Sequence, residues 1–248
     1  MKPMRILTWM ILAVTSFFTF SSCDDDEYVY YYAPIPNALV TVKPVDSGFY
    51  LQLDDSTTLH PCNVAASPFG DKEVRALLSY TCLGPSAEEG ATDRSFDVNI
   101  NWIDSILTKD AVPYPADGDL EQYGDDAIEI VRDWVNIAED GYLTLRFRTR
   151  WGAGGVTHFV NLLTGVNPDD PYEVEFKHNA YGDINGVLGD ALVAFKLSDL
   201  PDTGGKTVKL TLKYKSYSGE KSIQFDYCSR KSTATGQMER AAYSTRVK

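Results

Sequence analysis

Histidine, cysteine and the short motifs of common enzyme classes are scarce or absent in this sequence. Among its 248 residues are three histidines, His60, His158 and His178, and four cysteines. The chain has no GxSxG nucleophile elbow, no CxxC pair and no GxGxxG loop. Isolated histidines in strand-like segments are more often structural than catalytic. We therefore predict a protein that is not an enzyme, with no catalytic residues, no cofactor and no metal site.

Basic residues are outnumbered by acidic ones. The 23 lysines and arginines stand against 35 aspartates and glutamates, which gives a net charge of −12. Removal of the leader described next takes away Lys2 and Arg5 and changes the net charge to −14. Binding to nucleic acid depends on basic side chains that neutralise phosphates, and anionic lipid surfaces also attract positive charge. The composition therefore predicts no nucleic-acid partner.

A hydrophobic run long enough to span a membrane is also missing. The apolar stretch 6–20, ILTWMILAVTSFFTF, has 15 residues, whereas a transmembrane helix needs about 20. It follows Lys2 and Arg5 and ends at Ser21-Ser22-Cys23. This order is typical of a lipoprotein signal peptide, here 1–22, which is cut before a cysteine that receives acyl chains such as palmitate. We predict that Cys23 is lipidated and anchors the chain in membrane lipid; an ordinary secretory signal is the alternative.

The segment 23–36 continues with DDDE and then four tyrosines within five residues. Its charge and lack of apolar periodicity predict a solvated tether between the anchor and the folded part. Three cysteines remain after Cys23 is assigned to lipid, namely Cys62, Cys82 and Cys228. One interpretation is a disulfide between Cys62 and Cys82, with Cys228 left as a buried thiol. The other is that all three are small apolar side chains packed in strands.

Long helical patterns are absent, and apolar residues instead alternate with period two. Phe96, Val98, Ile100 and Trp102 lie on one face of such a segment. About five segments of this kind in 37–110 predict a small barrel, and about seven in 128–230 predict a β-sandwich. We interpret the stretch 111–127, rich in proline, glycine and acids, as the linker, and 231–248 as a C-terminal tail. The predicted fold is therefore all-β with two domains.

The acidic linker resembles a calcium loop only in part. Asp117, Asp119 and Glu121 alternate, but an EF-hand loop needs glycine at its sixth position and glutamate at its twelfth. Gln122 and Ile128 stand at those positions when the loop is counted from Asp117. The motif therefore predicts no calcium site.

Three arginines form the strongest candidate binding patch. Arg146, Arg148 and Arg150 alternate along one predicted strand, so their side chains project from one face. Guanidinium groups suit carboxylates and sulfates, which allows a site for an anionic glycan or a protein partner. We favour a structural role instead, in which Glu173 and Glu175 pair with the arginines across a sheet.

Exposed aromatic residues offer a second kind of binding site. Some small barrels bind oligosaccharides, and Tyr50 or Trp102 could stack on a sugar ring. Trp102 belongs to the apolar face of its strand, so we interpret it as a core residue. A glycan ligand therefore rests mainly on Tyr50.

Three long stretches resemble the NigD-like lipoproteins. They are NALVTVKPVDSGFYLQLDDSTTLHPCN at 37–63, SPFGDKEVRALLSY at 67–80 and DGYLTLRFRTRWGAGGVTHFVNLL at 140–163. The resemblance implies an N-terminal OB-type barrel followed by a C-terminal β-sandwich, and a role in bacteriocin production or self-immunity. It implies no catalytic or ligand-binding residues. The DDDE run is similar to a surface-export signal of such lipoproteins, which implies an outer-membrane location facing the cell exterior; an unspecific acidic spacer on a lipoprotein that faces the periplasm is the alternative.

Together these features predict a non-enzymatic lipoprotein of the cell envelope that acts by binding. Its partners would be outer-membrane lipid, through Cys23, and an unidentified envelope protein or glycan. A bacteriocin-associated or immunity-like role is our first interpretation. An accessory glycan-binding surface lipoprotein is the alternative.

Overall fold

The computed structural model describes residues 35–87 and 94–229. These residues form an all-β fold with one short 3-10 helix, η1 (Glu121–Tyr123). The predicted fold class, a barrel followed by a β-sandwich, is confirmed. The signal peptide, Cys23, most of the tether and the C-terminal tail lie outside the described residues. Among the described residues, no helix has the length and apolar character needed to cross a membrane.

The N-terminal domain is a closed barrel of five strands in the order β1-β2-β3-β5-β4. The strands are β1 (Ala38–Val45), β2 (Gly48–Gln52), β3 (Thr58–Pro61), β4 (Val74–Pro85) and β5 (Ser95–Ser105). Alternate residues such as Val40, Leu51 and Val98 are fully buried inside it. Register shifts interrupt the pairing of the long strands β4 and β5 at two places. Such bulges increase strand bending and twist, which helps a sheet of few strands to close.

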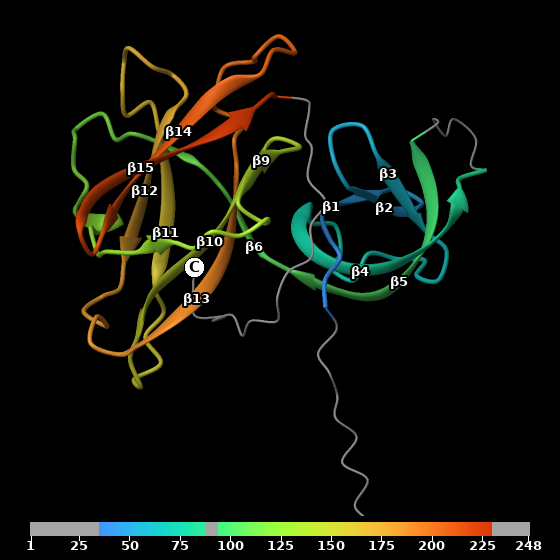
Figure 1. Cartoon of the computed structure of the whole chain (residues 1–248), viewed down its shortest axis with the longest axis horizontal. Helices are drawn as coiled ribbons and strands as arrows, with labels where there is room; N and C mark the ends of the chain where they lie inside the picture. Colours follow the sequence, from blue (N-terminus) through green and yellow to red (C-terminus); the bar gives the residue numbers. More distant parts are fainter. Residues whose placement is uncertain (1–34, 88–93, 230–248) are drawn as a thin grey trace, which may run out of the picture. The chain divides into compact units, whose positions relative to one another are not determined.

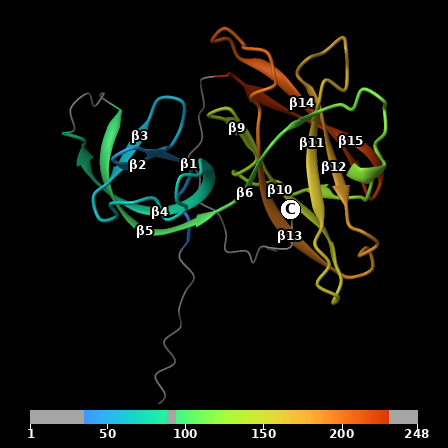
Figure 2. The same ribbon diagram turned by 180° about the vertical axis from the view of Figure 1, so that it is seen from behind.

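The C-terminal domain is a sandwich of two sheets (Figures 1 and 2). The first sheet contains β6 (Leu107–Asp110), β13 (Val187–Lys196), β10 (Tyr142–Trp151), β8 (Glu129–Ile130) and β9 (Ile137–Glu139). The second runs in the order β15 (Gly219–Tyr227), β14 (Val208–Ser216), β12 (Glu173–Asn179), β11 (Phe159–Thr164) and β7 (Val112–Pro113). Leu145 and Phe195 from the first sheet and Phe176 and Leu212 from the second belong to one buried core. The period of two in both sheets places these residues inward.

The predicted linker 111–127 needs a correction, because this segment is part of the sandwich. The strand β6, which the sequence placed in the barrel domain, pairs with β13, and β7 pairs with β11. The backbone N–H of Asp126 then donates to His178 at 2.9 Å. The barrel strands therefore end at Ser105 and the sandwich strands begin at Leu107. Strands of two to four residues are too short to show a period of two, which explains the error.

Polar contacts join residues of the barrel strands to residues of the sandwich strands. Arg75 of β4 is fully buried and forms an ion pair with Glu139 of β9. Its second nitrogen donates to the Thr41 hydroxyl at 3.0 Å. The Tyr142 hydroxyl donates to the Glu73 carboxylate at 2.5 Å. A buried pair of this kind is sensitive to the loss of either partner, since the remaining charge would have no counter-ion.

Candidate functional site: one end of the sandwich

Five large apolar side chains lie exposed on adjoining segments at one end of the sandwich. We call them the apolar patch: Phe159, Tyr181, Ile184, Val187 and Leu188, with exposed fractions of 37% to 76%. The Phe159 and Tyr181 rings touch edge to face, with centroids 5.4 Å apart. Figures 1 and 2 both show the β10–β11 and β12–β13 connections at this same end. Exposed apolar groups that gather in this way often mark interaction sites.

The two connections that frame the patch are joined by hydrogen bonds. The backbone N–H of Gly152 donates to the Asp183 carboxylate at 2.9 Å, and the Trp151 indole donates to the Gly189 carbonyl at 2.9 Å. Gly186 lies so close to the neighbouring strand that an added Cβ would be 1.9 Å from the Trp151 carbonyl oxygen. A side chain at this position would therefore push the two connections apart. The patch is held in shape by these contacts.

A buried chain of imidazoles supports the same loops. His158 and His178 are 0% and 1% exposed. His158 Nδ1 lies 2.9 Å from His178 Nε2. His158 Nε2 lies 3.2 Å from the Asp183 carboxylate, and His178 Nδ1 lies 3.3 Å from the Asp126 carbonyl. The Trp151 ring stacks on His158 with centroids 4.3 Å apart.

The hydrogens of the two rings limit how many of these contacts can be hydrogen bonds at once. The Asp126 carbonyl and the Asp183 carboxylate only accept, so the three contacts need three N–H hydrogens. Two neutral imidazoles supply two. All three bonds form together only with a third hydrogen, which an imidazolium would supply. Burial, followed by the electrostatic effect of His158, lowers the pKa of His178 to about 4.

The three arginines of the predicted binding patch differ in their contacts and in their exposure. Arg146 donates to Asp133 and to Asp190, and its side chain is only 12% exposed. Arg148 donates from Nε to Asp190 at 2.5 Å, while 45% of its side chain stays exposed. Arg150 is exposed and donates to the Gly186 carbonyl at 3.0 Å. Arg146 is thus a structural residue, whereas Arg148 and Arg150 present guanidinium groups at the surface.

The acidic partners of the arginines differ from those the sequence suggested. Glu173 and Glu175 lie on β12, in the other sheet, and pair with Lys213 and Lys177. Asp190 takes their place because it stands directly opposite Arg148 on the neighbouring strand β13. Burial opposes the charge on Asp190, but hydrogen bonds from Arg148 and Arg146 lower the pKa of its carboxyl group.

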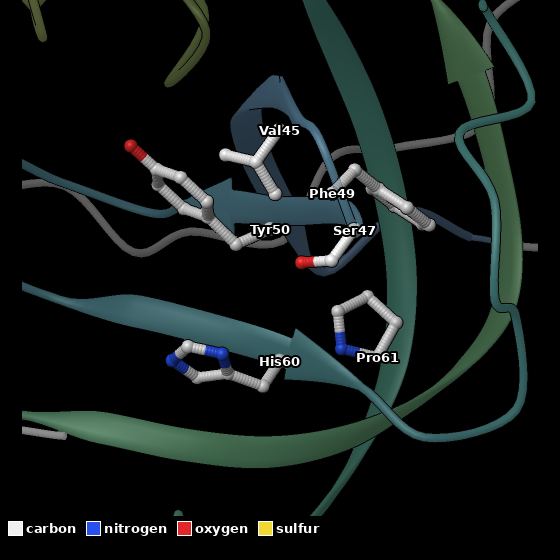
Figure 3. Close-up of a pocket in the computed structure, with 6 residues that line it drawn as sticks. All are labelled: Val45, Ser47, Phe49, Tyr50, His60 and Pro61. Atoms are coloured by element: carbon white, nitrogen blue, oxygen red, sulfur yellow. The ribbon is translucent and has the colours of Figure 1, made fainter. Parts of the chain in front are cut away.

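A small pocket on the barrel contains the predicted sugar-binding tyrosine (Figure 3). Its volume is about 150 Å³ and it lies between the β1–β2 turn and strands β2 and β3; its lining residues are Val45, Ser47, Phe49, Tyr50, His60 and Pro61. In Figure 3 the Tyr50 and His60 rings extend from neighbouring strands toward the same side. OB folds often bind ligands on this face. Trp102, in contrast, is partly buried and packs against a different hydrophobic cluster from Val98 and Ile100, because a register shift separates Ile100 from Trp102 in the pairing of β5.

Cys62 and Cys82 are free and exposed, so they form neither the possible disulfide nor buried apolar side chains. The N–H of Cys62 bonds to Val98 from one side, and Cys82 pairs with Val98 from the other. The two cysteines are therefore separated by two strand spacings, about 9.5 Å, which exceeds the separation of about 7 Å that a disulfide tolerates. Cys228 is buried and accepts a hydrogen bond from Thr203 at 3.6 Å.

The acidic residues of the rejected calcium motif accept hydrogen bonds from nearby backbone N–H groups. The Asp117 carboxylate accepts from the N–H of Asp119 at 3.1 Å, and Asp119 accepts from the N–H of Glu121 at 2.9 Å. Such contacts are typical of turns. Within residues 35–87 and 94–229, no group of His, Cys, Asp and Glu side chains is arranged to hold a metal ion.

Fold and surface define a two-domain all-β protein whose most prominent surface features suit binding. A family model described as the NigD-like N-terminal OB domain matches residues 39–106. A second, the NigD-like C-terminal beta sandwich domain, matches residues 111–227. The chain therefore belongs to the NigD-like family, as the resemblance implied.

Solved structures of similar fold come from species of Parabacteroides and Bacteroides. A protein described as toxin-related from Parabacteroides distasonis is 35% identical, covers 79% of this chain and 94% of its own, and has a TM-score of 0.62. A NigD-like immunity protein from Bacteroides caccae is 20% identical, covers 79% and 93%, and has a TM-score of 0.53. A protein described as a lipoprotein from Bacteroides fragilis is 9% identical, covers 81% and 100%, and has a TM-score of 0.51. The comparison with curated proteins finds no significant match.

Proposed function

We propose that this protein is a non-enzymatic lipoprotein of the cell envelope that binds a protein partner through the apolar patch. The observation that carries the proposal is the patch itself, with Arg148 and Arg150 beside it. Aromatic residues and arginine are enriched at the centres of protein interfaces and contribute much of their binding energy. The hydrogen bonds between the β10–β11 and β12–β13 connections also support binding through the patch, since a surface that is ordered before binding loses less conformational entropy on binding.

The charge near the patch indicates what the partner presents. Asp190 and Asp133 neutralise most of the charge of Arg146 and Arg148. Arg150 has a backbone carbonyl as its hydrogen-bond acceptor and so adds a positive charge to the surface of a strongly acidic protein. The partner surface that fits is apolar at its centre with carboxylates at its rim.

The two buried histidines support the proposal that the protein is not an enzyme. His158 and His178 are enclosed by Trp151 and Phe147 and have almost no exposed surface. Their ring nitrogens already bond to each other, to Asp183 and to Asp126. A general base must reach a proton of its substrate, and these side chains have no open path to one.

An immunity-like role is supported by the relatives. The chain belongs to the NigD-like family, and similar proteins are described as toxin-related and as an immunity protein. An immunity protein acts by binding, which agrees with a preformed surface on a rigid sandwich. The partner we propose is therefore a bacteriocin-related or other envelope protein.

The proposed location rests on the leader and on Cys23. Replacement of Cys23 by Ala should release the mature chain from the outer membrane or leave the uncut precursor. The measurement is fractionation of cells followed by detection of the chain and its size. Protease added to intact cells then tests whether the anchored protein faces the exterior. A Cys23→Ala variant that stays in the membrane fraction at mature size would contradict the anchor.

Partner capture tests the proposed binding surface. Wild type, Leu188→Glu and Leu83→Glu should be expressed in the native cells and cross-linked, and captured proteins identified by mass spectrometry. Leu83 lies on the barrel and is 54% exposed, the same as Leu188, so it controls for a new surface charge. We expect wild type and Leu83→Glu to capture the same partner protein. Binding of the purified partner to Leu188→Glu should weaken by about tenfold or more. Equal binding by all three proteins would refute the proposal.

Accessory glycan binding is a second candidate function, and the barrel pocket favours it. The pocket combines apolar groups, Phe49 and Pro61, with the hydroxyls of Ser47 and Tyr50. A pyranose ring has an apolar face and a polar edge and suits such a lining, and the volume of about 150 Å³ admits one ring at most. Binding to a glycan array should then be lost in Tyr50→Ala and kept in Tyr114→Ala, an exposed tyrosine of the sandwich. Arrays with no bound glycan would rule out this function.

A further inference from the structure

Strand β13 has an edge that no neighbouring strand covers, beside the apolar patch. On one side β13 pairs with β10 from Val187 to Lys196, but on the other side β6 covers only Val193–Lys196. Within the part of the chain that the structure describes, no strand pairs with the preceding residues on that side. We call residues 187–191 the open edge. At about 3.3 Å per residue it extends for about 16 Å.

The two edges of the second sheet are protected, and the open edge is not. Strand β15 carries Glu220, Lys221 and Asp226 along its exposed edge. On β11, the Lys109 ammonium group donates to the Val160 carbonyl at 2.8 Å and so occupies the unpaired backbone. Charged side chains and covering groups of this kind prevent unwanted strand pairing. The open edge reads VLGDA, without lysine or proline, and its one charged residue is already bound by arginines.

Two guanidinium groups lie over this edge. Arg148 reaches across to Asp190, and Arg150 reaches to the carbonyl of Gly186, directly before the edge begins. The register places Leu188 opposite Arg150 and Asp190 opposite Arg148, so these side chains share the outer face of the sheet. A strand added along the edge would place alternate side chains next to Leu188 and Asp190, on the face where Arg148 and Arg150 reach over β13.

We propose that the open edge binds an extended segment of a partner protein, which adds to β13 as a further strand. The segment would carry acidic side chains toward Arg148 and Arg150. Its alternate apolar side chains would cover Val187, which is 76% exposed. Main-chain hydrogen bonds supply affinity in this mode of recognition, and side chains on alternate positions supply specificity. This inference rests on the proposed function, since it states how the same partner would bind.

A second copy of this chain fits the edge less well than such a segment. Two copies that paired along the edge in a two-fold symmetric way would each offer the other only Leu188 and Asp190 on the outer face. The Asp190 carboxylate is already bound by its own arginines, so a second copy brings no new carboxylate to the guanidinium groups. The charge arrangement therefore favours a different chain with carboxylates.

A synthetic peptide tests the inference with the full mature protein. The probe is a fluorescein-labelled heptapeptide of alternating valine and glutamate, and fluorescence anisotropy reports its binding. We expect saturable binding by wild type and by Leu83→Lys. Binding should weaken by about tenfold or more in Leu188→Lys, which gives the edge the lysine that protects other edges.

Two further peptides separate strand addition from a contact of side chains alone. N-methylation of alternate backbone nitrogens, in either of the two registers, removes hydrogen bonds on one side of the peptide and keeps its side chains. One of the two methylated peptides should bind about tenfold more weakly than the parent, and a valine–lysine peptide should be weakened as well. Equal binding of the parent and both methylated peptides would overturn the inference, as would absence of binding by the parent at millimolar concentration.

The outcomes also distinguish this inference from the proposed function. If Leu188→Glu loses its captured partner but the peptide does not bind, the patch binds proteins without strand addition and only this inference fails. If the peptide binds but partner capture does not depend on the patch, the proposed function fails. A wild-type protein that forms a dimer, with 187–191 protected from hydrogen exchange in the dimer alone, would assign the edge to a second copy and overturn the inference.

Discussion

The buried histidine pair makes the stability of the sandwich sensitive to mild acid. His178 has a pKa of about 4 in the folded protein, because burial and the electrostatic effect of His158 both disfavour its protonation. The same side chain has a pKa of about 6.5 in an unfolded chain. Between these values the unfolded state binds more protons than the folded state. The contribution of His178 to stability is therefore complete above pH 6.5 and is lost as the pH falls through 6.5 toward 4.

The difference between the two pKa values sets the size of the effect. Each pKa unit corresponds to about 1.4 kcal/mol, so a change from pH 7 to pH 4.5 should remove about 2 kcal/mol of unfolding free energy. His178→Gln keeps an acceptor for the His158 N–H and removes the titrating group. This variant should lose about 2 kcal/mol less than wild type over the same range of pH. Urea unfolding followed by tryptophan fluorescence measures the difference, since Trp151 stacks on His158.

The titration of Asp55 changes the stability with pH in the opposite direction, so the experiment needs a control for it. Burial is the main cause that raises its pKa to about 6, and the carboxylates of Asp140 and Glu139 add to it. An acid with a raised pKa stabilises the fold below the unfolded value, and this stabilisation is lost as the pH rises through 6. The comparison should therefore be repeated on an Asp55→Asn background. If wild type and His178→Gln lose equal stability between pH 7 and 4.5 there as well, His178 is not the buried neutral ring described above.

Two further predictions follow from the ion pair and the cysteines. Arg75→Met leaves Glu139 buried without its counter-ion and should destabilise the protein by about 3–5 kcal/mol. Addition of Glu139→Leu should restore most of the lost stability, as measured by thermal unfolding. Equal melting temperatures for wild type and Arg75→Met would contradict this prediction. In the folded protein from which the lipid anchor has been removed, a maleimide should label Cys62 and Cys82 but reach Cys228 only after unfolding. Failure to label the first two under non-reducing conditions would instead indicate a bond between them.

The sequence was sufficient for the two-domain all-β fold because the long strands alternate. β10 and β14 bury every second residue along most of their length, and this pattern distinguishes a strand from a helix. The domain boundary was misplaced because β6 and β7 have only four and two residues. Such strands form because longer neighbours, β13 and β11, offer them an edge. Their existence therefore depends on tertiary pairing that no local pattern shows.

The candidate site was predictable only in part, for a similar reason. Alternation placed the three arginines on one face, but the choice between Glu175 and Asp190 as a partner depends on which strands are neighbours. The apolar patch was missed because its residues come from three segments. A local signal did exist at Val187-Leu188, where two consecutive apolar residues follow the turn-forming Asn185-Gly186. A strand with one buried face should have only one apolar residue of such a pair.

The buried imidazoles and the exposed patch are parts of one arrangement. Asp183 accepts from His158 in the interior and from the Gly152 N–H in the opposite connection, and its chain neighbour Ile184 is part of the patch. Ordering a loop residue costs about 1–2 kcal/mol, so a loop of several residues that became ordered only on binding would reduce affinity considerably. The contacts of Asp183 with His158 and with the Gly152 N–H hold this loop while the protein is free. The buried imidazoles thus support the surface on which we propose the partner binds.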